Sequence, residues 1–280
     1  MAILSIQSAV AYGHVGNSAA VFPLQRLGHE VWPVDTVQFS NHTGYGAWRG
    51  RAWDAAALAE VIRGVGERGA FARCDAVLSG YLGEPALGAV VLDAVAQVKA
   101  ANPAALYCCD PVIGDDHSGV FVRPGLIEFF RDRALPAADI VTPNRFELAL
   151  LAGAAVASVP EALAACAALR RRGPRLVLAT SLAGADADEI AMLAAGDDAW
   201  LVATPRLPFV ANGAGDLAAA LFLGHWLRTR DAAAALGDAA AGIYAVIEAT
   251  WRSGAAELQL VAAQDALVSP PRRFAVQRVA

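Results

Sequence analysis

The stretch that decides the fold is Asn212-Gly213-Ala214-Gly215-Asp216. It follows a strand-like segment, residues 199–204, and opens an apolar, helix-like run over residues 217–227. Two glycines let the main chain approach a ligand closely, and the start of a helix turns its N–H groups and the positive end of its dipole towards an anion. A carboxylate is repelled by a bare phosphate, so its place beside one makes sense only if it acts as the base for an attacking hydroxyl. The stretch therefore predicts phosphoryl transfer to an alcohol, with Asp216 as the base.

Composition excludes several other classes of protein. The chain has 280 residues, 56% of them hydrophobic, and a formal charge of −5, which argues against a nucleic-acid partner. No apolar run reaches about 18 residues, and no basic segment precedes the apolar start, so we expect neither a membrane partner nor a signal peptide. The four cysteines include no CxxC pair, which indicates a reducing, cytoplasmic location.

Short apolar runs alternate with longer Ala-rich periodic runs along the whole chain. This alternation predicts an α/β fold with a central, mainly parallel sheet covered by helices on both faces, in one domain over residues 1–280. Residues 268–280, which contain Pro270-Pro271, are expected to form a loosely held tail. The predicted strands are residues 3–6, 30–37, 76–79, 106–109, 139–141 and 176–179, with an antiparallel pair at 189–193 and 199–202. The predicted helices are residues 16–27, 53–66, 84–101, 125–130, 145–151 and 160–172, followed by a mostly helical part over 216–268.

Carboxylates follow two neighbouring predicted strands. Asp110 ends one strand, and Thr142-Pro143-Asn144-Arg145-Phe146-Glu147 ends the next and enters a helix. Asp110 and Glu147 would meet near the glycine-rich stretch, because ligands in open α/β sheets lie beyond the carboxyl ends of the strands. Two hard oxygen ligands there suit Mg²⁺. The structural alternatives are a turn cap at Asp110 and a capping box formed by Asn144 and Glu147.

Polar and aromatic residues follow the other strands. Ser8 lies just past the first strand, residues 36–45 form a polar loop with aromatic side chains, and residues 79–83 read Ser-Gly-Tyr-Leu-Gly. Residues 36–45 and 79–83 together predict one wall of an aromatic pocket, and Ser8 is expected to contact the substrate. The alternatives are that residues 12–18, which follow Ser8, form a turn in which Asn17 or Ser18 caps the next helix, and that residues 36–45 are an ordinary exposed loop. Residues 114–120, which include Asp115, predict a flap that excludes water, and Thr180-Ser181 predicts a phosphate contact or a simple turn.

These motifs resemble those of the pyridoxal kinases, in the ribokinase-like superfamily, over about residues 3–267. The glycine motif ending in Asp216 marks the superfamily, whereas residues 36–43 and 79–83 are more specific for the pyridoxal branch. The resemblance implies a three-layer α/β/α fold, ATP as co-substrate, Mg²⁺ with a monovalent cation such as K⁺, and a homodimer. It implies that Asp216 takes the proton from the 5′-hydroxyl of pyridoxal.

The resemblance also implies the surrounding site residues. The developing phosphoryl charge would be held by Gly213, Ala214 and Gly215. The substrate ring would be bound by Ser8, Val15, Val37, Phe39, His42, Thr43, Gly44 and Tyr81. The ATP phosphates would be bound by Asp110, Thr142, Asn144, Glu147, Thr180, Ser181, Gly213 and Gly215, the adenine by Leu207 and its neighbours up to Val210, and the metal by Asp110, Asp115 and Glu147.

Two departures from the family pattern keep alternatives open. Thr180 stands where bacterial relatives often carry Lys, and residues 204–211 look shorter than in those relatives. These two departures support the second alternative, that the protein binds pyridoxal without phosphorylating it. A kinase for hydroxymethylpyrimidine or a related vitamin ring is the first alternative, and a sugar kinase is disfavoured by the aromatic cluster of Phe39, Tyr45 and Tyr81.

Overall fold

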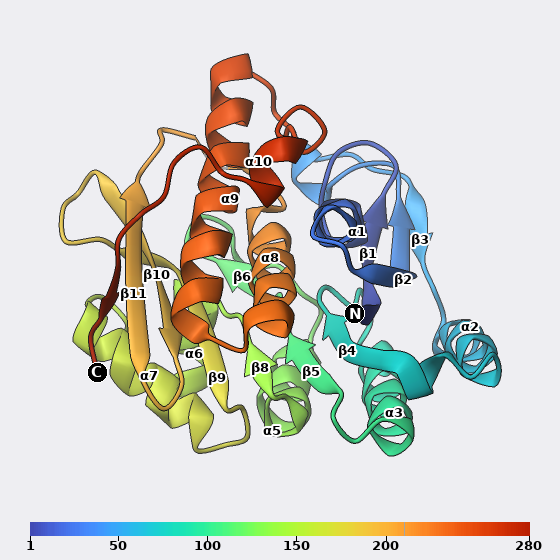
Figure 1. The fold of residues 1–280 in the computed structure, drawn as a ribbon. Helices are drawn as coiled ribbons and strands as arrows, with labels where there is room; N and C mark the ends of the chain where they lie inside the picture. The colour runs from blue at the N-terminus through green and yellow to red at the C-terminus, as the bar shows by residue number, and fades with distance from the viewer. Residues whose placement is uncertain (210) are drawn as a thin grey trace.

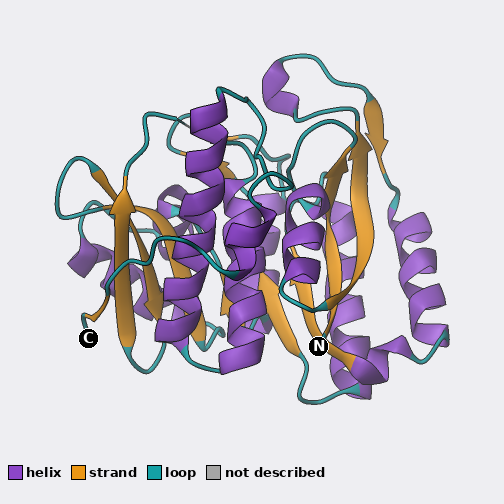
Figure 2. Ribbon diagram, turned by 45° about the horizontal axis from the view of Figure 1, so that its top comes forward, coloured by secondary structure: helices purple, strands orange, loops and turns teal. Residues whose placement is uncertain are grey.

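The computed structural model describes residues 1–209 and 211–280. Its centre is a ten-stranded sheet in the order β12-β11-β10-β9-β8-β5-β4-β1-β2-β3, with helices on both faces (Figures 1 and 2). The middle of the sheet, from β2 to β9, is parallel, and its edges are antiparallel. The predicted α/β class and mainly parallel sheet are confirmed. The parallel strands are β1 (Ala2–Val10), β2 (Glu30–Phe39), β4 (Cys74–Ser79), β5 (Leu106–Cys109), β8 (Ile140–Val141) and β9 (Leu176–Ala183).

Two hydrophobic cores lie on opposite faces of this sheet. One contains side chains of the N-terminal helix and of the C-terminal helices, and the other contains those of the middle helices. The first face carries α1 (Asn17–Arg26), α8 (Ala214–Thr229), α9 (Ala232–Ser253) and α10 (Gln264–Val268). The second carries α2 (Ala55–Glu67), α3 (Pro85–Ala101), α4 (Leu126–Phe129), α5 (Leu135–Ala137), α6 (Arg145–Ala152) and α7 (Val159–Arg170).

Three short strands within residues 50–120 were not expected from the sequence. β3 (Gly50–Ala52) extends the sheet beside β2, and β6 (Gly114–Asp115) pairs with β7 (Gly119–Val120) as a small separate hairpin. These segments are short and lack alternating apolar residues, which is why periodicity did not find them. The antiparallel strands β10 (Glu189–Ala195) and β11 (Ala199–Pro205) form the predicted pair and are longer than expected.

The expectation of a loosely held tail is wrong for the last residues of the chain. β12 (Val276–Arg278) pairs antiparallel with β11, and Figure 1 shows the tail running along that strand. Just before it, Arg273 forms an ion pair with Asp238 on α9, and the ring of Phe274 packs edge-on against Tyr244 at 5.0 Å between centroids. The two prolines therefore precede an ordered edge strand, a pairing that local composition does not reveal.

One described helix, α9, is long and apolar enough to cross a membrane by length and composition, which the sequence-based search for apolar runs did not anticipate. Half of its most apolar window is buried in the fold, where it packs against α8 and β11. A core helix meets the same criterion, so this property alone decides nothing.

The docking of the tail can be tested at Phe274. Phe274→Ala removes an aromatic pair worth about 1 kcal/mol, so we expect the Tm to fall by roughly 2–4 °C in a chain of this size. The control is Val261→Ala, because that side chain is 62% exposed. Equal Tm values for both variants by calorimetry would contradict the docked position.

Candidate active site

Polar side chains gather beyond the carboxyl ends of five neighbouring strands. In the sheet order β9-β8-β5-β4-β1, these strands end at or near Thr180, Thr142, Asp110, Ser79 and Ser8, respectively. All five side chains are buried. Because parallel strands end at the same edge of a sheet, residues far apart in sequence are brought to one face, as the sequence predicted.

The glycine-rich stretch forms the start of α8. Gly213 precedes the helix in the left-handed region, at φ 83°, and a side chain there would overlap the main-chain carbonyl of His14. Gly215 is exposed, and a Cβ atom there would meet no atom within 4 Å. The first-turn N–H groups of a helix have no intrahelical acceptor. The first turn therefore has open space beside Gly215, where an anion can approach the main chain, whereas the N–H of the half-buried Ala214 donates to the carbonyl of Ala211 at 3.4 Å.

Asp216 lies in this first turn and is half-buried. Burial raises the pKa of its carboxyl group to about 6, and hydrogen bonds from the main-chain N–H groups of Gly16 and of Asp216 itself oppose the rise. Gly16 precedes α1, so the two helix starts meet at this carboxylate. A carboxylate with a pKa near 6 is ionised at neutral pH and is a better proton acceptor than an ordinary aspartate.

Two more carboxylates are buried beside Asp216. Burial raises the pKa of Asp110 well above its ordinary value, and the charges of Glu147 and Asp216 raise it further. Thr142 donates a hydrogen bond of 2.8 Å to Asp110, and this bond acts in the opposite direction. In residues 1–209 and 211–280, none of the three carboxylates forms an ion pair with Lys or Arg. The cluster therefore favours the approach of a cation.

Glu147 has a structural role as well. Its carboxylate accepts main-chain N–H groups from Ile113 at 2.8 Å and Asn144 at 2.9 Å, and Asn144 in turn accepts from the N–H of Glu147. The capping box at the start of α6, given above as a structural alternative, is therefore present. Burial still raises the pKa of Glu147 to about 8, and these hydrogen bonds oppose the rise.

The expected set of three metal-binding carboxylates does not come together. Asp115 accepts the main-chain N–H groups of His117 and Ser118, at 2.9 and 2.5 Å, and so closes the turn of its own hairpin. Within residues 1–209 and 211–280 no group of three or more His, Cys, Asp and Glu side chains has the arrangement of a metal site. Asp110 and Glu147 remain, and one or two carboxylates with waters and phosphates are the ligand set that Mg²⁺ prefers.

The aromatic wall is formed by β2 and its neighbours. Val37 and Phe39 of β2 pack with Val15 in a small apolar cluster, and Tyr81 packs against its edge. Thr36 donates a hydrogen bond of 2.7 Å to the carbonyl of Tyr81 and so holds the segment after β4 against β2. An apolar cluster is therefore present where the sequence predicted one wall of a pocket, and Ser8 is buried on the neighbouring strand β1.

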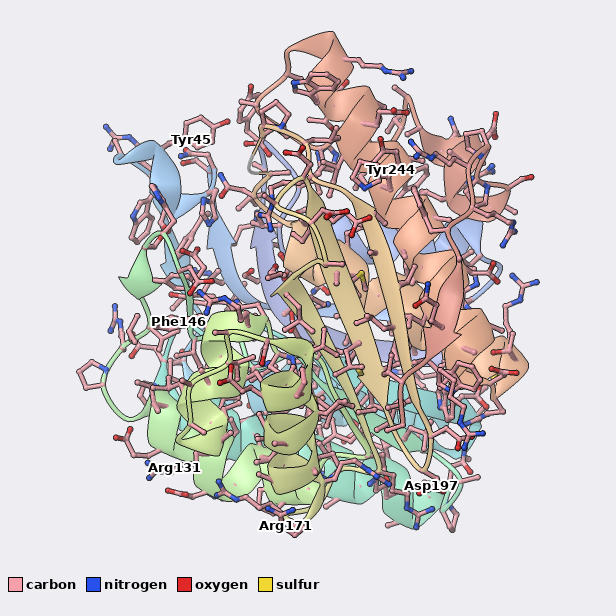
Figure 3. The ribbon with its side chains drawn as sticks, turned by 90° about the vertical axis from the view of Figure 1, so that its left-hand side faces the viewer. Tyr45, Arg131, Phe146, Arg171, Asp197 and Tyr244 are labelled. Carbon is pink, nitrogen blue, oxygen red and sulfur yellow. The ribbon has the colours of Figure 1, made fainter. Side chains whose placement is uncertain are left out.

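The loop after β2 covers one end of this wall. Thr43 begins a short 3₁₀ turn, residues 43–45, and both Thr43 and Gly44 are exposed. Before the turn, Nδ1 of His42 accepts the N–H of Gly44 at 3.2 Å. The ring of Trp48 lies on Phe39 at 4.1 Å between centroids, a contact the sequence analysis missed. Figure 3 shows Tyr45 at the rim of this loop, above Phe146 at the start of α6.

Thr180 and Ser181 lie where β9 is irregular. The register between β9 and β10 shifts across them, and Ser181 has a φ of 58°, which is rare for a residue with a side chain. Asn144 is bridged to Thr180 in parallel. Strained residues and bulges are common at functional sites, because they re-aim side chains. The geometry therefore supports the position that the sequence suggested for these hydroxyls.

The segment expected to contact adenine is only partly described. Leu207 is half-buried, and its carbonyl accepts the N–H of Phe209 at 2.8 Å. Val210 lies outside the described residues.

Comparisons with known proteins agree with this geometry. A family model described as phosphomethylpyrimidine kinase matches residues 58–260. The chain is 61% identical to "Pyridoxal kinase PdxY" of Rubrobacter xylanophilus over 99% of this chain and 97% of the relative, and 53% identical to "Pyridoxal kinase PdxY" of Leifsonia xyli subsp. xyli over the whole of both. The chain belongs to the pyridoxal kinase family.

A solved structure extends the comparison to the fold. The pyridoxal kinase of Leishmania donovani in complex with ADP and pyridoxine is 28% identical, covers 100% of this chain and 99% of its own, and superposes with a TM-score of 0.93. The family phosphorylates a hydroxyl group, so the predicted chemistry is confirmed at the level of the family.

The open space in front of Gly215 gives a direct test of the anion site. Gly215→Ala should fold as the wild type does, because no atom lies near the added methyl group, yet this group would occupy the space of the phosphate. Misplacing a main-chain donor of this kind costs about 10²-fold in kcat. The matched control is Gly64→Ala in α2, where a Cβ also meets no atom. Equal kcat for the two variants, both with wild-type Tm, would contradict the anion site.

The raised pKa of Asp216 predicts a pH dependence. Below pH 6 the carboxyl group is protonated and cannot accept a proton, so kcat/KM should fall on the acid side with a midpoint near the pKa of about 6. Asp216→Asn should lower kcat by about 10²–10⁴-fold and leave the fold intact. Steady-state kinetics from pH 5 to 9 measure both effects, and an Asn variant with wild-type kcat would rule out Asp216 as the base.

Proposed function

We propose that this protein transfers the γ-phosphoryl group of ATP to the 5′-hydroxyl of pyridoxal and forms pyridoxal 5′-phosphate. The observation that carries the proposal is the position of Asp216. It is a half-buried carboxylate with a raised pKa, in the first turn of α8, where the glycines leave the main chain open. Full-length relatives named pyridoxal kinase, and related enzymes solved with ADP and a vitamin B6 compound, support the same reaction.

The mechanism follows from the residues of the site. Asp216 accepts the proton of the 5′-hydroxyl as the hydroxyl oxygen attacks the γ-phosphorus, and the bond from the γ-phosphorus to the bridging oxygen breaks with ADP as the leaving group. The main chain of Gly213, Ala214 and Gly215 stabilises the charge on the transferred group. Little covalent chemistry is left to the protein, because phosphoryl transfer is catalysed mainly by positioning and charge stabilisation. Ser8 and Thr43 bind the polar edge of the ring.

The remaining contacts divide between the ring and the nucleotide. The faces of the ring would pack on the wall of Val15, Val37, Phe39 and Tyr81, with His42 and Gly44 at its end. The ATP phosphates would be bound by Asn144, Thr142, Thr180 and Ser181.

Mg²⁺ belongs to this proposal, held by Asp110 and Glu147. Both side chains are buried carboxylates with raised pKa values, the charge of Glu147 contributes to the rise at Asp110, and a divalent cation would offset this repulsion. When bound, the ion neutralises charge on the ATP phosphates. K⁺ as a second cation, a homodimeric state and a cytoplasmic location complete the proposal, and they rest on the family alone.

A kinase for hydroxymethylpyrimidine is the second candidate, favoured by the description of the family model that matches residues 58–260. The names of the full-length relatives favour pyridoxal over it. The two acceptors share a hydroxymethyl group on a nitrogen-containing aromatic ring, so the reaction itself does not separate them.

A coupled ADP-release assay tests both candidates together. Pyridoxal, pyridoxine, pyridoxamine and hydroxymethylpyrimidine are compared at equal concentration, with Mg²⁺ and with EDTA. We expect the highest kcat/KM with one of the three vitamin B6 compounds, and loss of activity in EDTA. A higher kcat/KM with hydroxymethylpyrimidine would contradict the proposed acceptor, and binding of pyridoxal with no ADP release would identify a protein without turnover.

A further inference from the structure

Glu257 is a buried carboxylate that the mechanism above does not use. It lies between α9 and α10 and is only 7% exposed. One carboxylate oxygen accepts the main-chain N–H of His14 at 3.0 Å, and the other accepts the hydroxyl of Tyr45 at 2.6 Å. A side chain at Gly13 would overlap this carboxylate, so the segment before α1 is packed directly onto Glu257. The sequence analysis missed this residue, because it lies in a part of the chain that was expected to be helical.

The backbone around Glu257 is held firmly. Leu258 and Leu260, which follow it, are fully buried. Thr250 on α9 accepts the N–H of Gln259 at 2.9 Å, and the side chain of Gln259 donates to the carbonyl of Glu257 at 3.0 Å. Glu257 is therefore a fixed point against which other segments are positioned.

One segment fixed by Glu257 leads to the anion site. The carbonyl of His14 is packed against Gly213, and Leu258 lies 3.3 Å from the position of a Cβ atom at Gly213. Two residues after His14, the main-chain N–H of Gly16 faces the carboxylate of Asp216 and lowers its pKa. Glu257 thus contacts the segment of residues 14–16, in which His14 packs against Gly213 and Gly16 faces Asp216.

The other segment is the loop of residues 40–49, which carries His42 and Thr43. Tyr45 connects this loop to a distant part of the chain. Among the described residues, its bond to Glu257 is the only hydrogen bond from residues 41–48 to any residue outside 11–52. This bond raises the pKa of Tyr45 to about 12, so the hydroxyl remains a donor at all working pH values. Hydrogen bonds to a charged acceptor are about twice as strong as neutral ones.

We propose that Glu257 is a positioning residue, which holds the substrate loop through Tyr45 and the anion site through His14 in one arrangement. Both carboxylate oxygens of Glu257 accept hydrogen bonds from the protein itself. It sets the distance between the residues that bind the ring and those that bind the phosphate. This inference rests on the proposed function and identifies a residue that would determine the affinity for the alcohol substrate.

The test uses three variants of the full-length protein. Tyr45→Phe removes only the hydroxyl and should raise the KM for pyridoxal about fivefold while the KM for ATP changes less than about twofold. Glu257→Gln should act in the same direction and more weakly, because a neutral amide still pairs with Tyr45. The double variant should be no worse than Tyr45→Phe alone, since both changes act on the bond between Tyr45 and residue 257, and the amide oxygen of Gln can still accept the N–H of His14.

Tyr244→Phe is the matched control. Its hydroxyl also donates to a glutamate, Glu248 at 3.2 Å, but it lies on α9 (Figure 3) and outside the proposed site. Its kinetics should equal those of the wild type. A multiplicative effect in the double variant, or an equal rise in both KM values, would overturn the proposal.

Amide hydrogen exchange without substrates separates this inference from the proposed function. In the wild type, the N–H groups of Tyr45 and Gly46 are bonded to the carbonyls of His42 and Thr43. Tyr45→Phe should speed their exchange about fivefold, whereas Tyr244→Phe should not. Unchanged exchange in Tyr45→Phe overturns the inference even if pyridoxal is phosphorylated. Faster exchange in a protein that does not phosphorylate pyridoxal leaves the loop contact standing and rejects the proposed function.

Discussion

The site depends on three carboxylates, Asp110, Glu147 and Asp216, which are brought together where the strands end. Burial raises the pKa of each of them, and none has an ion pair with Lys or Arg in the described part of the chain. Like charges at short distance in a desolvated site oppose ionisation. The arrangement becomes favourable when positive charge is supplied, by the start of α8 and by a cation bound with the nucleotide. A cation at this site would therefore reduce the repulsion between the three carboxylates.

Two glycines allow segments of the main chain to approach one another closely at this site. A side chain at Gly213 would overlap the carbonyl of His14, and one at Gly16 would overlap Ser8. These two close contacts bring the starts of α1 and α8 to the same point, where the N–H of Gly16 meets Asp216. In the part of the chain that the structure describes, the proposed base Asp216 is thus oriented by main-chain N–H groups, which fix it without adding a further charge.

Much of this could be predicted from the sequence, for local reasons. The alternation of apolar runs indicated the parallel sheet, and the glycine stretch before an apolar run indicated the helix start at Asp216. The capping box of Asn144 and Glu147, which the sequence offered as the structural alternative to a metal role, is present. These features are encoded within a few residues of one another, where spacing carries the signal.

The features that sequence reasoning missed depend on contacts between distant parts of the chain. Glu257 meets His14 across 243 residues, and β12 pairs with β11 although prolines precede it. Asp115 was expected to bind a metal, but it accepts two main-chain N–H groups of its own turn. The spacing of residues in the sequence does not show whether a carboxylate will bind a metal or close a turn.

The most direct measurement is a crystal structure of the Asp216→Asn variant with ATP, Mg²⁺ and pyridoxal, which should trap the complex before transfer. The account predicts the 5′-hydroxyl oxygen within about 3.2 Å of the substituted side chain at position 216, with the γ-phosphate in front of the main chain of residues 213–215. A pyridoxal ring bound elsewhere, or a γ-phosphate directed away from the start of α8, would contradict it.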